Sequence, residues 1–147
     1  MNSVSTCLWF DDQALAAAQL YVSLFEDAKI TAIFRTVQGV MTVEFDLMGQ
    51  HYWGLNGGPL FPHYPACSIS VHVDTQAEVD RLWAALTEGG RESRCGWLVD
   101  RFGLSWQIIP RALPRLLKSD STGRVMAAMM SMAKIDIAAL VAAYNTP

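Results

Sequence analysis

The stretch DRFGLSW at residues 100–106 decides the fold, because DLMGQHY at residues 46–52 has the same spacing of aspartate, glycine and aromatic side chain. A second pair of matches, DDQA at 11–14 and DTQA at 74–77, follows alternating apolar stretches and opens helix-like runs. The two pairs are separated by 54 and 63 residues, so the second copy has a middle segment nine residues shorter. Agreement of order, spacing and flanking pattern indicates an internal repeat of two modules.

Each module reads as a strand, a helix and three further strands. In the first module we expect a helix near 12–25 and strands near 5–10, 29–36, 40–47 and 50–56. Asp11 or Asp12 is the expected N-cap of the helix. Its apolar face is expected to consist of Ala14, Ala18, Tyr21, Val22 and Phe25.

The second module begins with the alternating strand SISVHV at 68–73. Thr75 and Glu78 then form a T-x-x-E capping box, which predicts a helix that ends at Gly89–Gly90. A further strand is expected near 91–94, where RESR has no apolar face.

Residues 56–65, NGGPLFPHYP, contain three prolines and two glycines and are typical of a linker. After Pro110 we expect helices in RALPRLLK, at 121–133 and at 136–144. The sequence therefore predicts an α+β fold in which two βαβββ modules form a curled eight-stranded sheet with a C-terminal helical extension. We expect one domain with module 1 at about 1–57, a linker at 58–66, module 2 at about 67–110 and a helical tail at 111–147.

The composition argues against two classes of partner. A formal net charge of -3 without a basic cluster gives little attraction for nucleic acid or an anionic membrane. No stretch approaches the ~20 apolar residues of a spanning helix. Cys7, Cys67 and Cys95 form no CxxC pair, so neither a zinc knuckle nor a disulfide framework is indicated. We therefore expect a cytoplasmic protein.

Side chains alternate between the two faces of a strand, which predicts the face of the sheet that carries function. Apolar side chains such as Leu8, Phe10 and Trp106 should face the helices. The opposite face should carry hydroxyls, aromatic rings, imidazoles and one amide: Ser5, Cys7, Trp9, His51, Trp53, Leu55, Ser68, Ser70, His72, Ser105, Gln107 and Ile109. If the modules curl around each other, these residues line a pocket that suits a small molecule.

Several stretches resemble one known family. CLWFDDQ with the following AQLYVSLF, the LNGGP turn, CGWLVDRFGLSWQIIP and KIDIAAL are similar to the PhnB-like branch of the vicinal oxygen chelate (glyoxalase/bleomycin-resistance) superfamily. This branch is often catalogued as 3-demethylubiquinone-9 3-methyltransferase-like. The resemblance covers nearly the whole chain and implies a curled eight-stranded sheet, usually in a dimer, with a site inside each curl.

In metal-using members, each module supplies one ligand from its first strand and one from its last. The resemblance places these positions at Ser5, Trp53 or Gly54, Ser68 and Gln107. None is a strong metal ligand, because hydroxyls and a neutral amide give a divalent cation little charge compensation. We therefore expect no metal of the family kind and no other cofactor.

Other residues could carry chemistry instead. His51, His72 and Glu44 lie on polar faces and could form an alternative metal site or act as catalytic acid–base groups. Cys95 is a candidate nucleophile, although a buried structural thiol is the simpler interpretation. His63 lies in the linker and is expected to be solvated. Core or dimer contact is the expected role of Met126, Met129, Met130 and Met132.

Two functions are consistent with this sequence: a protein that binds a small, partly aromatic molecule, or an enzyme that acts on a bound metabolite. The methyltransferase label is not supported, because no glycine-rich turn joins a strand to a helix. Gln107 either orients an uncharged group of a ligand or bonds Ser68, Ser105 or backbone across the sheet. A homodimer is expected because the tail has apolar positions that need a partner surface: Val125, Met126, Met129, Met130, Ile137, Leu140 and Tyr144.

Overall fold

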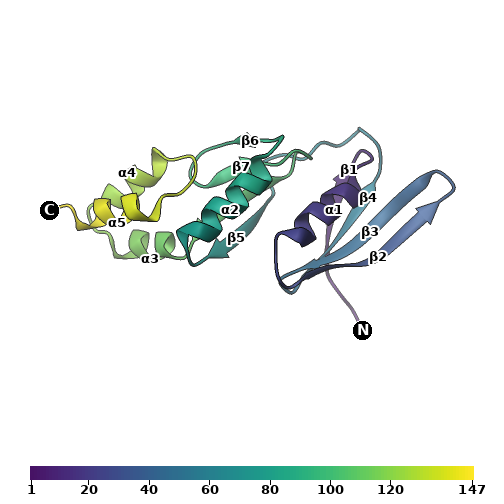
Figure 1. The fold of residues 1–147 in the computed structure, drawn as a ribbon, viewed down its shortest axis with the longest axis horizontal. Helices are drawn as coiled ribbons and strands as arrows, with labels where there is room; N and C mark the ends of the chain where they lie inside the picture. Colours follow the sequence, from purple (N-terminus) through teal and green to yellow (C-terminus); the bar gives the residue numbers. More distant parts are fainter. The chain divides into compact units, whose positions relative to one another are not determined.

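The computed structural model describes residues 1–147 as two units, Met1–His63 and Tyr64–Pro147. The first unit (Figure 1) contains β1 (Thr6–Phe10), α1 (Ala14–Ser23), β2 (Ala28–Thr36), β3 (Gly39–Leu47) and β4 (Gln50–Asn56). Its sheet has the order β1-β4-β3-β2, in which β1 is parallel to β4 and the other neighbours are antiparallel. The four predicted strands are confirmed to within one residue at each end.

The second unit contains β5 (Ser68–Val73), α2 (Gln76–Thr87), β6 (Arg91–Glu92), β7 (Trp97–Val99) and β8 (Ser105–Pro110). Its sheet order, β5-β8-β7-β6, repeats that of the first unit. The tail adds α3 (Ala112–Ser119), α4 (Arg124–Met130) and α5 (Ile137–Asn145). The predicted α+β fold is confirmed as eight strands in two four-stranded mixed sheets, with five helices.

Strand pairing reproduces the internal repeat residue by residue. Cys7 lies opposite Trp53 in the parallel pair β1–β4, and Ser70 lies opposite Gln107 in the parallel pair β5–β8. Ser70 follows Cys7 by 63 residues and Gln107 follows Trp53 by 54 residues, which are the offsets of the sequence matches. Corresponding side chains of these two parallel strand pairs therefore lie on corresponding faces of the two sheets.

The two D-x-x-G stretches form different turns. In the first unit, Met48 and Gly49 join β3 to β4 with positive φ values of 49° and 84°, as a two-residue type I′ hairpin requires. In the second unit, the backbone N–H of Asp100 donates to the carbonyl of Leu104 across a loop that is one residue longer. This difference leaves Asp46 on the outer face of its sheet and turns the side chain of Asp100 into the interior.

The expected N-cap of α1 is wrong. Gln13 holds the N-cap position without a side-chain bond, and neither Asp11 nor Asp12 caps the helix. The Oδ1 atom of Asn56 instead accepts a hydrogen bond of 2.9 Å from the N–H of Ala14. Asn56 comes from the end of β4, so a distant strand supplies the group that satisfies the helix terminus.

The buried face of α1 consists mainly of small residues, which bring the helix close to the sheet. Val22 and Phe25, expected on this face, are only half-buried, while Leu24 is 7% exposed. The fully buried residues are Ala14, Ala17, Ala18 and Tyr21.

Helix α2 begins with the predicted capping box. The hydroxyl of Thr75 accepts from the N–H of Glu78, and the carboxylate of Glu78 accepts from the N–H of Thr75. The bonds from Thr75 lower the pKa of the Glu78 carboxyl. The helix ends at Thr87, close to the predicted glycines. The strand predicted near 91–94 is confirmed for its first two residues, which form the exposed strand β6.

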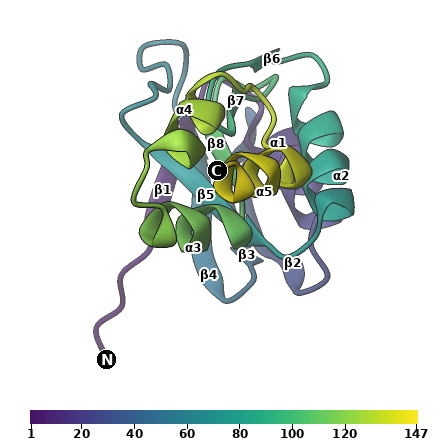
Figure 2. The same cartoon turned by 90° about the vertical axis from the view of Figure 1, so that its left-hand side faces the viewer.

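The three tail helices form a hydrophobic core of their own, and Figure 2 shows them gathered at the C-terminus. Gln76 of α2 joins this core to the second module, because its amide donates to the carbonyl of Ile135 and accepts from the N–H of Ile137. The buried residues are Leu113, Val125, Ile135 and Leu140.

Part of the tail's apolar face remains open. Met129 and Met132 pack against the tail core, as expected, whereas Met126 and Met130 are 47% and 54% exposed. Tyr144 is also exposed, so the core covers only some of the positions predicted to need a partner. All five helices fall short of the length and apolar character that crossing a bilayer demands.

Candidate functional site

The outer face of the first sheet carries the side chains that strand alternation predicts. Trp53 lies between Cys7 on β1 and Glu44 on β3. Of the two alternatives for the family position, Trp53 is on this outer face and Gly54 faces α1, where a Cβ would meet that of Ala14 at 3.1 Å. Partial burial raises the pKa of the Cys7 thiol, which therefore stays protonated at neutral pH.

An imidazole and a carboxylate meet on the same outer face. The Nδ1 atom of His51 lies 2.7 Å from Oδ1 of Asp46, and the side chains are 41% and 34% exposed. The carboxylate orients the ring and favours a proton on Nδ1. The Nε2 atom, which makes no hydrogen bond within the chain, can then accept a proton from a bound molecule.

Trp9, expected to line the pocket, is covered by the linker. Its Nε1 donates to the carbonyl of Gly58 at 2.8 Å, and its ring meets that of Phe61 edge-on, with centroids 5.0 Å apart. A Cβ at Gly57 would overlap the indole. Ser5 precedes β1 and is exposed. Leu55 pairs with Trp9 and is half-buried.

The amide of Gln107 is oriented by a serine on the neighbouring strand of the second sheet. Its Nε2 lies 3.0 Å from the hydroxyl of Ser68, which is one of the two roles predicted for this residue. Because a hydroxyl can donate or accept, either end of the amide can meet Ser68. The other end makes no hydrogen bond within the chain. Gln107 also lies opposite Ser70 and Trp97, and its side chain is half-buried.

The remaining predicted residues of the second sheet differ in exposure. Ser70 and His72 are exposed and lie 3.2 Å apart from hydroxyl to Nε2. Ser105 is only 1% exposed, and its hydroxyl has no hydrogen-bond partner. Ile109, opposite His72, is half-buried. Ser70, His72 and Gln107 thus form the accessible polar part of this face.

Metal-ligating side chains do not gather. No group of three or more His, Cys, Asp and Glu side chains is arranged to hold a metal ion. His51 contacts Asp46, whereas His72 contacts Ser70 in the other unit. Glu44 pairs in register with Ala32 and Trp53.

Two residues outside the sheets differ in burial from expectation: Cys95 is half-buried instead of buried, and His63 is less exposed than a solvated loop residue. The thiol of Cys95 contacts the thioether of Met130 at 3.7 Å, and no histidine accompanies it. His63 is half-buried, and its ring meets that of Phe10 at a centroid distance of 5.3 Å. The expectation that His63 is a solvated loop residue is therefore wrong, because the linker folds back onto β1.

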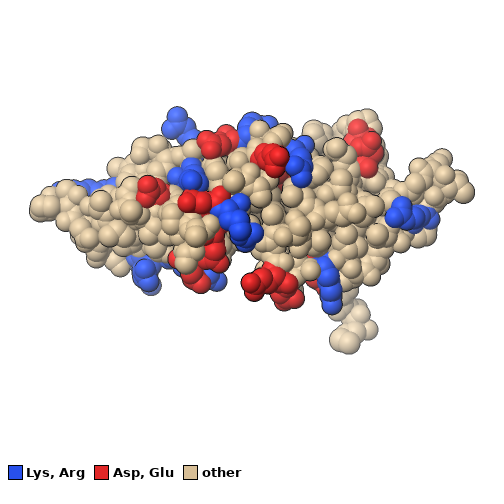
Figure 3. Space-filling view, in the orientation of Figure 1, with Lys and Arg blue, Asp and Glu red and all other residues tan.

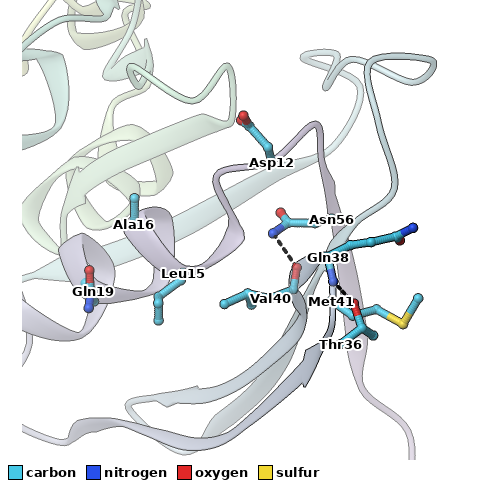
Figure 4. Close-up of a pocket in the computed structure, with 9 residues that line it drawn as sticks. All are labelled: Asp12, Leu15, Ala16, Gln19, Thr36, Gln38, Val40, Met41 and Asn56. Carbon is cyan, nitrogen blue, oxygen red and sulfur yellow. Dashed lines mark hydrogen bonds between the residues drawn. The ribbon is translucent and has the colours of Figure 1, made fainter.

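A cavity of about 540 Å³ in the first unit lies outside the predicted face. In Figure 4, Leu15 of α1 and Val40 of β3 point toward each other across it, and the Asn56 amide donates to the Val40 carbonyl at 3.0 Å. No sequence pattern predicts this cavity, since it depends on where the β2–β3 hairpin ends beside α1. Its remaining lining residues are Asp12, Ala16, Gln19, Thr36, Gln38 and Met41.

Charge does not mark a site on the surface shown in Figure 3. Acidic and basic side chains are interspersed on that face, without an extended basic patch. This pattern agrees with the weak net charge of -3.

Residues 2–109 match the family described as 3-demethylubiquinone-9 3-methyltransferase. The chain belongs to this family. The match covers both βαβββ modules and ends before the tail helices of this 3-demethylubiquinone-9 3-methyltransferase family member. No curated protein matches the chain.

Solved structures share the fold. The PhnB protein of Bacillus cereus is 28% identical, with a TM-score of 0.70 over 74% of this chain and 99% of that one. Protein PA1353 of Pseudomonas aeruginosa is 22% identical, with a TM-score of 0.62 over 75% and 98%. A mutant of the fosfomycin resistance protein FosX of Listeria monocytogenes, complexed with Mn(II) and a dihydroxypropylphosphonic acid, is 15% identical, with a TM-score of 0.55 over 74% and 92%. The latter two likenesses concern the fold alone, which is the glyoxalase fold.

Proposed function

We propose that this family member binds a small, uncharged, partly aromatic molecule on the outer face of its second sheet, without transforming it. The Gln107 amide carries the proposal: Ser68 orients it, and one of its ends stays available on a half-buried surface. A neutral amide can donate to or accept from an uncharged group, whereas a glutamate would place a charge there. Trp97, opposite Gln107, supplies an aromatic surface.

We also propose that binding needs no metal of the family kind. Ser68 and Gln107, which hold two of the implied ligand positions, are hydrogen-bonded to each other. The corresponding positions of the first module hold Ser5 and Trp53, a hydroxyl and an indole. This donor set offers a divalent cation no anionic ligand.

All three cysteines are free, which fits the proposed location in the reducing cytoplasm.

A ligand screen tests the binding proposal. Thermal shift with small uncharged aromatic compounds, with and without divalent metals, should identify a stabilising ligand. Gln107→Leu should then weaken its binding by roughly 1 to 3 kcal/mol, the cost of an unsatisfied polar partner, with little change in Tm. The fluorescence of Trp97, isolated by comparison with Trp97→Phe, should change on binding.

Gln38→Leu is the matched control, because Gln38 is an exposed amide beside the cavity of Figure 4. It should leave affinity unchanged. A loss of affinity in Gln38→Leu alone would place the ligand in that cavity. Lower stability with full affinity in Gln107→Leu would make the amide structural and refute the site.

An enzyme is the second candidate, favoured by the 2.7 Å contact of His51 with Asp46. The free Nε2 of His51 would act as a general base on a metabolite, a role worth about 100-fold or more in rate. For any metabolite that the protein converts, His51→Gln should remove most of the turnover. His72→Gln is the control, because His72 contacts a hydroxyl rather than a carboxylate. Equal turnover in wild type and His51→Gln would exclude this role.

A further inference from the structure

The amide of Gln107 has more hydrogen-bonding capacity than the chain uses. A glutamine side chain offers two N–H donors and a carbonyl oxygen that can accept twice. Ser68 occupies only one of these positions, at 3.0 Å. Whichever end of the amide meets Ser68, at least one N–H and one oxygen lone pair make no hydrogen bond within the chain. The half-buried side chain therefore presents a donor and an acceptor in one plane.

This combination of donor and acceptor matches a second amide. With Ser68 on the N–H that points away from the amide oxygen, the other N–H and the oxygen of Gln107 form one edge. A lactam or primary carboxamide has the complementary edge, because its C=O can accept from Gln107 while its N–H donates to the Gln107 oxygen. We propose that the ligand of the second sheet is a flat aromatic lactam or carboxamide that pairs edge to edge with Gln107. This inference rests on the proposed function and names the chemical class of its ligand.

The neighbouring strands offer an uncharged surface for a flat ring. Trp97 on β7 lies directly opposite Gln107, so the two side chains share a face with their Cβ atoms about 5 Å apart. Ser70 lies opposite Gln107 on the other side, in β5. Neither neighbour carries a charge that would favour an ion over a neutral ligand. A ring stacked on the indole of Trp97 would hold its amide edge beside Gln107.

Ser105 gives a second sign of a missing partner. It is only 1% exposed and its hydroxyl makes no hydrogen bond, which is rare for a buried polar group. Gln107 is in register with Ser70 but bonds Ser68. Because Ser68 is in register with Ser105, the amide leans toward Ser105. A ligand carbonyl that accepts from Gln107 is therefore placed to accept from the Ser105 hydroxyl as well.

A lactam and a lactone of the same shape test the pairing. Isoquinolin-1(2H)-one and isocoumarin share the bicyclic ring and the carbonyl, but isocoumarin has a ring oxygen in place of the N–H. Isothermal titration calorimetry of the full-length protein should show at least about tenfold tighter binding of the lactam, because the lactone leaves the Gln107 oxygen unpaired. This comparison uses wild type alone, so it does not depend on the folding of a variant.

Gln107→Met keeps the length of the side chain and removes its amide. The lactam and the lactone should bind this variant within about twofold of each other, because the group that distinguishes them is gone. Gln38→Met is the matched control, since Gln38 is an exposed amide in the other unit. It should keep the preference for the lactam.

Ser105→Ala tests the contact with the ligand carbonyl. Both compounds have this carbonyl, so both should bind about threefold or more weakly. The Tm of the free protein should not fall, because the substitution removes a buried hydroxyl that bonds nothing. Full affinity for both compounds in Ser105→Ala would overturn the role of Ser105.

The outcomes separate this inference from the proposed function. Equal binding of lactam and lactone to wild type would overturn the inference and leave the proposed function intact, since an aromatic ligand would still be bound. A preference for the lactam that survives in Gln107→Met would also overturn it. If the lactam does not bind while other neutral aromatic compounds stabilise the protein, the inference alone is wrong. If no such compound stabilises the protein, the proposed function is wrong as well.

Discussion

The carboxylate of Asp100 accepts a hydrogen bond of 2.9 Å from the indole nitrogen of Trp106 in the interior of the second unit. It also accepts from the backbone N–H groups of Phe102 and Leu104 at 2.8 and 3.0 Å. Asp46, its counterpart in the sequence repeat, contacts only the half-exposed His51. The same spacing thus gives one aspartate that stabilises a turn and one that faces solvent.

This divergence predicts unequal costs of substitution. Asp100→Ala leaves three donors without an acceptor, two of them in the interior, and should lower the free energy of unfolding by about 3 kcal/mol or more. Asp46→Ala removes one accessible pair and should cost about 0 to 1 kcal/mol. Urea denaturation of both variants measures the difference. Equal costs would show that the turn does not depend on Asp100.

The N-cap of α1 gives a second matched pair. Asn56→Ala removes the acceptor of the Ala14 N–H and should destabilise the protein by about 1 to 2 kcal/mol. Asp12→Ala should change stability by less than about 0.5 kcal/mol, because its carboxylate caps nothing. Thermal unfolding of the two variants decides between them, and a larger effect at Asp12 would reinstate the cap expected from the sequence.

Metal content tests the interpretation of the family positions. Protein purified without a tag and dialysed should contain well under one equivalent of zinc, nickel, manganese or iron, because Ser5, Trp53, Ser68 and Gln107 supply no anionic ligand. Plasma emission measures this directly. One equivalent of bound metal would contradict this interpretation and would favour the alternative metal site of His51, His72 and Glu44.

We expect a homodimer in which the tail helices provide contact surface. Val141 and Tyr144 of α5 remain 39% and 41% exposed although the tail has its own core. Light scattering at micromolar concentration should give twice the chain mass, and Val141→Lys should weaken association. Deletion of residues 120–147 should cause aggregation, since it uncovers Leu113. A wild-type monomer would refute the dimer.

Asp120 should make the tail sensitive to acid. Its carboxylate accepts from the hydroxyl of Thr122 and the N–H of Val125, and these bonds lower the pKa of Asp120. The stabilisation is present above the usual carboxyl pKa of 3.8 and disappears as pH falls through the lower folded value. Asp120→Asn should therefore have a lower Tm than wild type at neutral pH, and the difference should shrink as pH falls below 3.8. A constant difference across this range would contradict the assignment.

The sequence by itself determined the repeated architecture. Alternation and helical periodicity are local, so they predicted the strands of the first module within a residue and the faces of Cys7, Trp53 and Gln107. The capping box of Thr75 and Glu78 was also predictable, because its bonds join residues three apart.

Only the tertiary structure decided which of these faces are accessible and which residues become partners. Asn56 caps a helix 42 residues away, Phe61 covers Trp9 through a folded linker, and Cys95 meets Met130 across 35 residues. Such contacts depend on the path of the intervening chain, which no local pattern encodes. One extra residue in a turn likewise sent Asp100 inward and left Asp46 outside, because a shift of one position reverses the face of a strand.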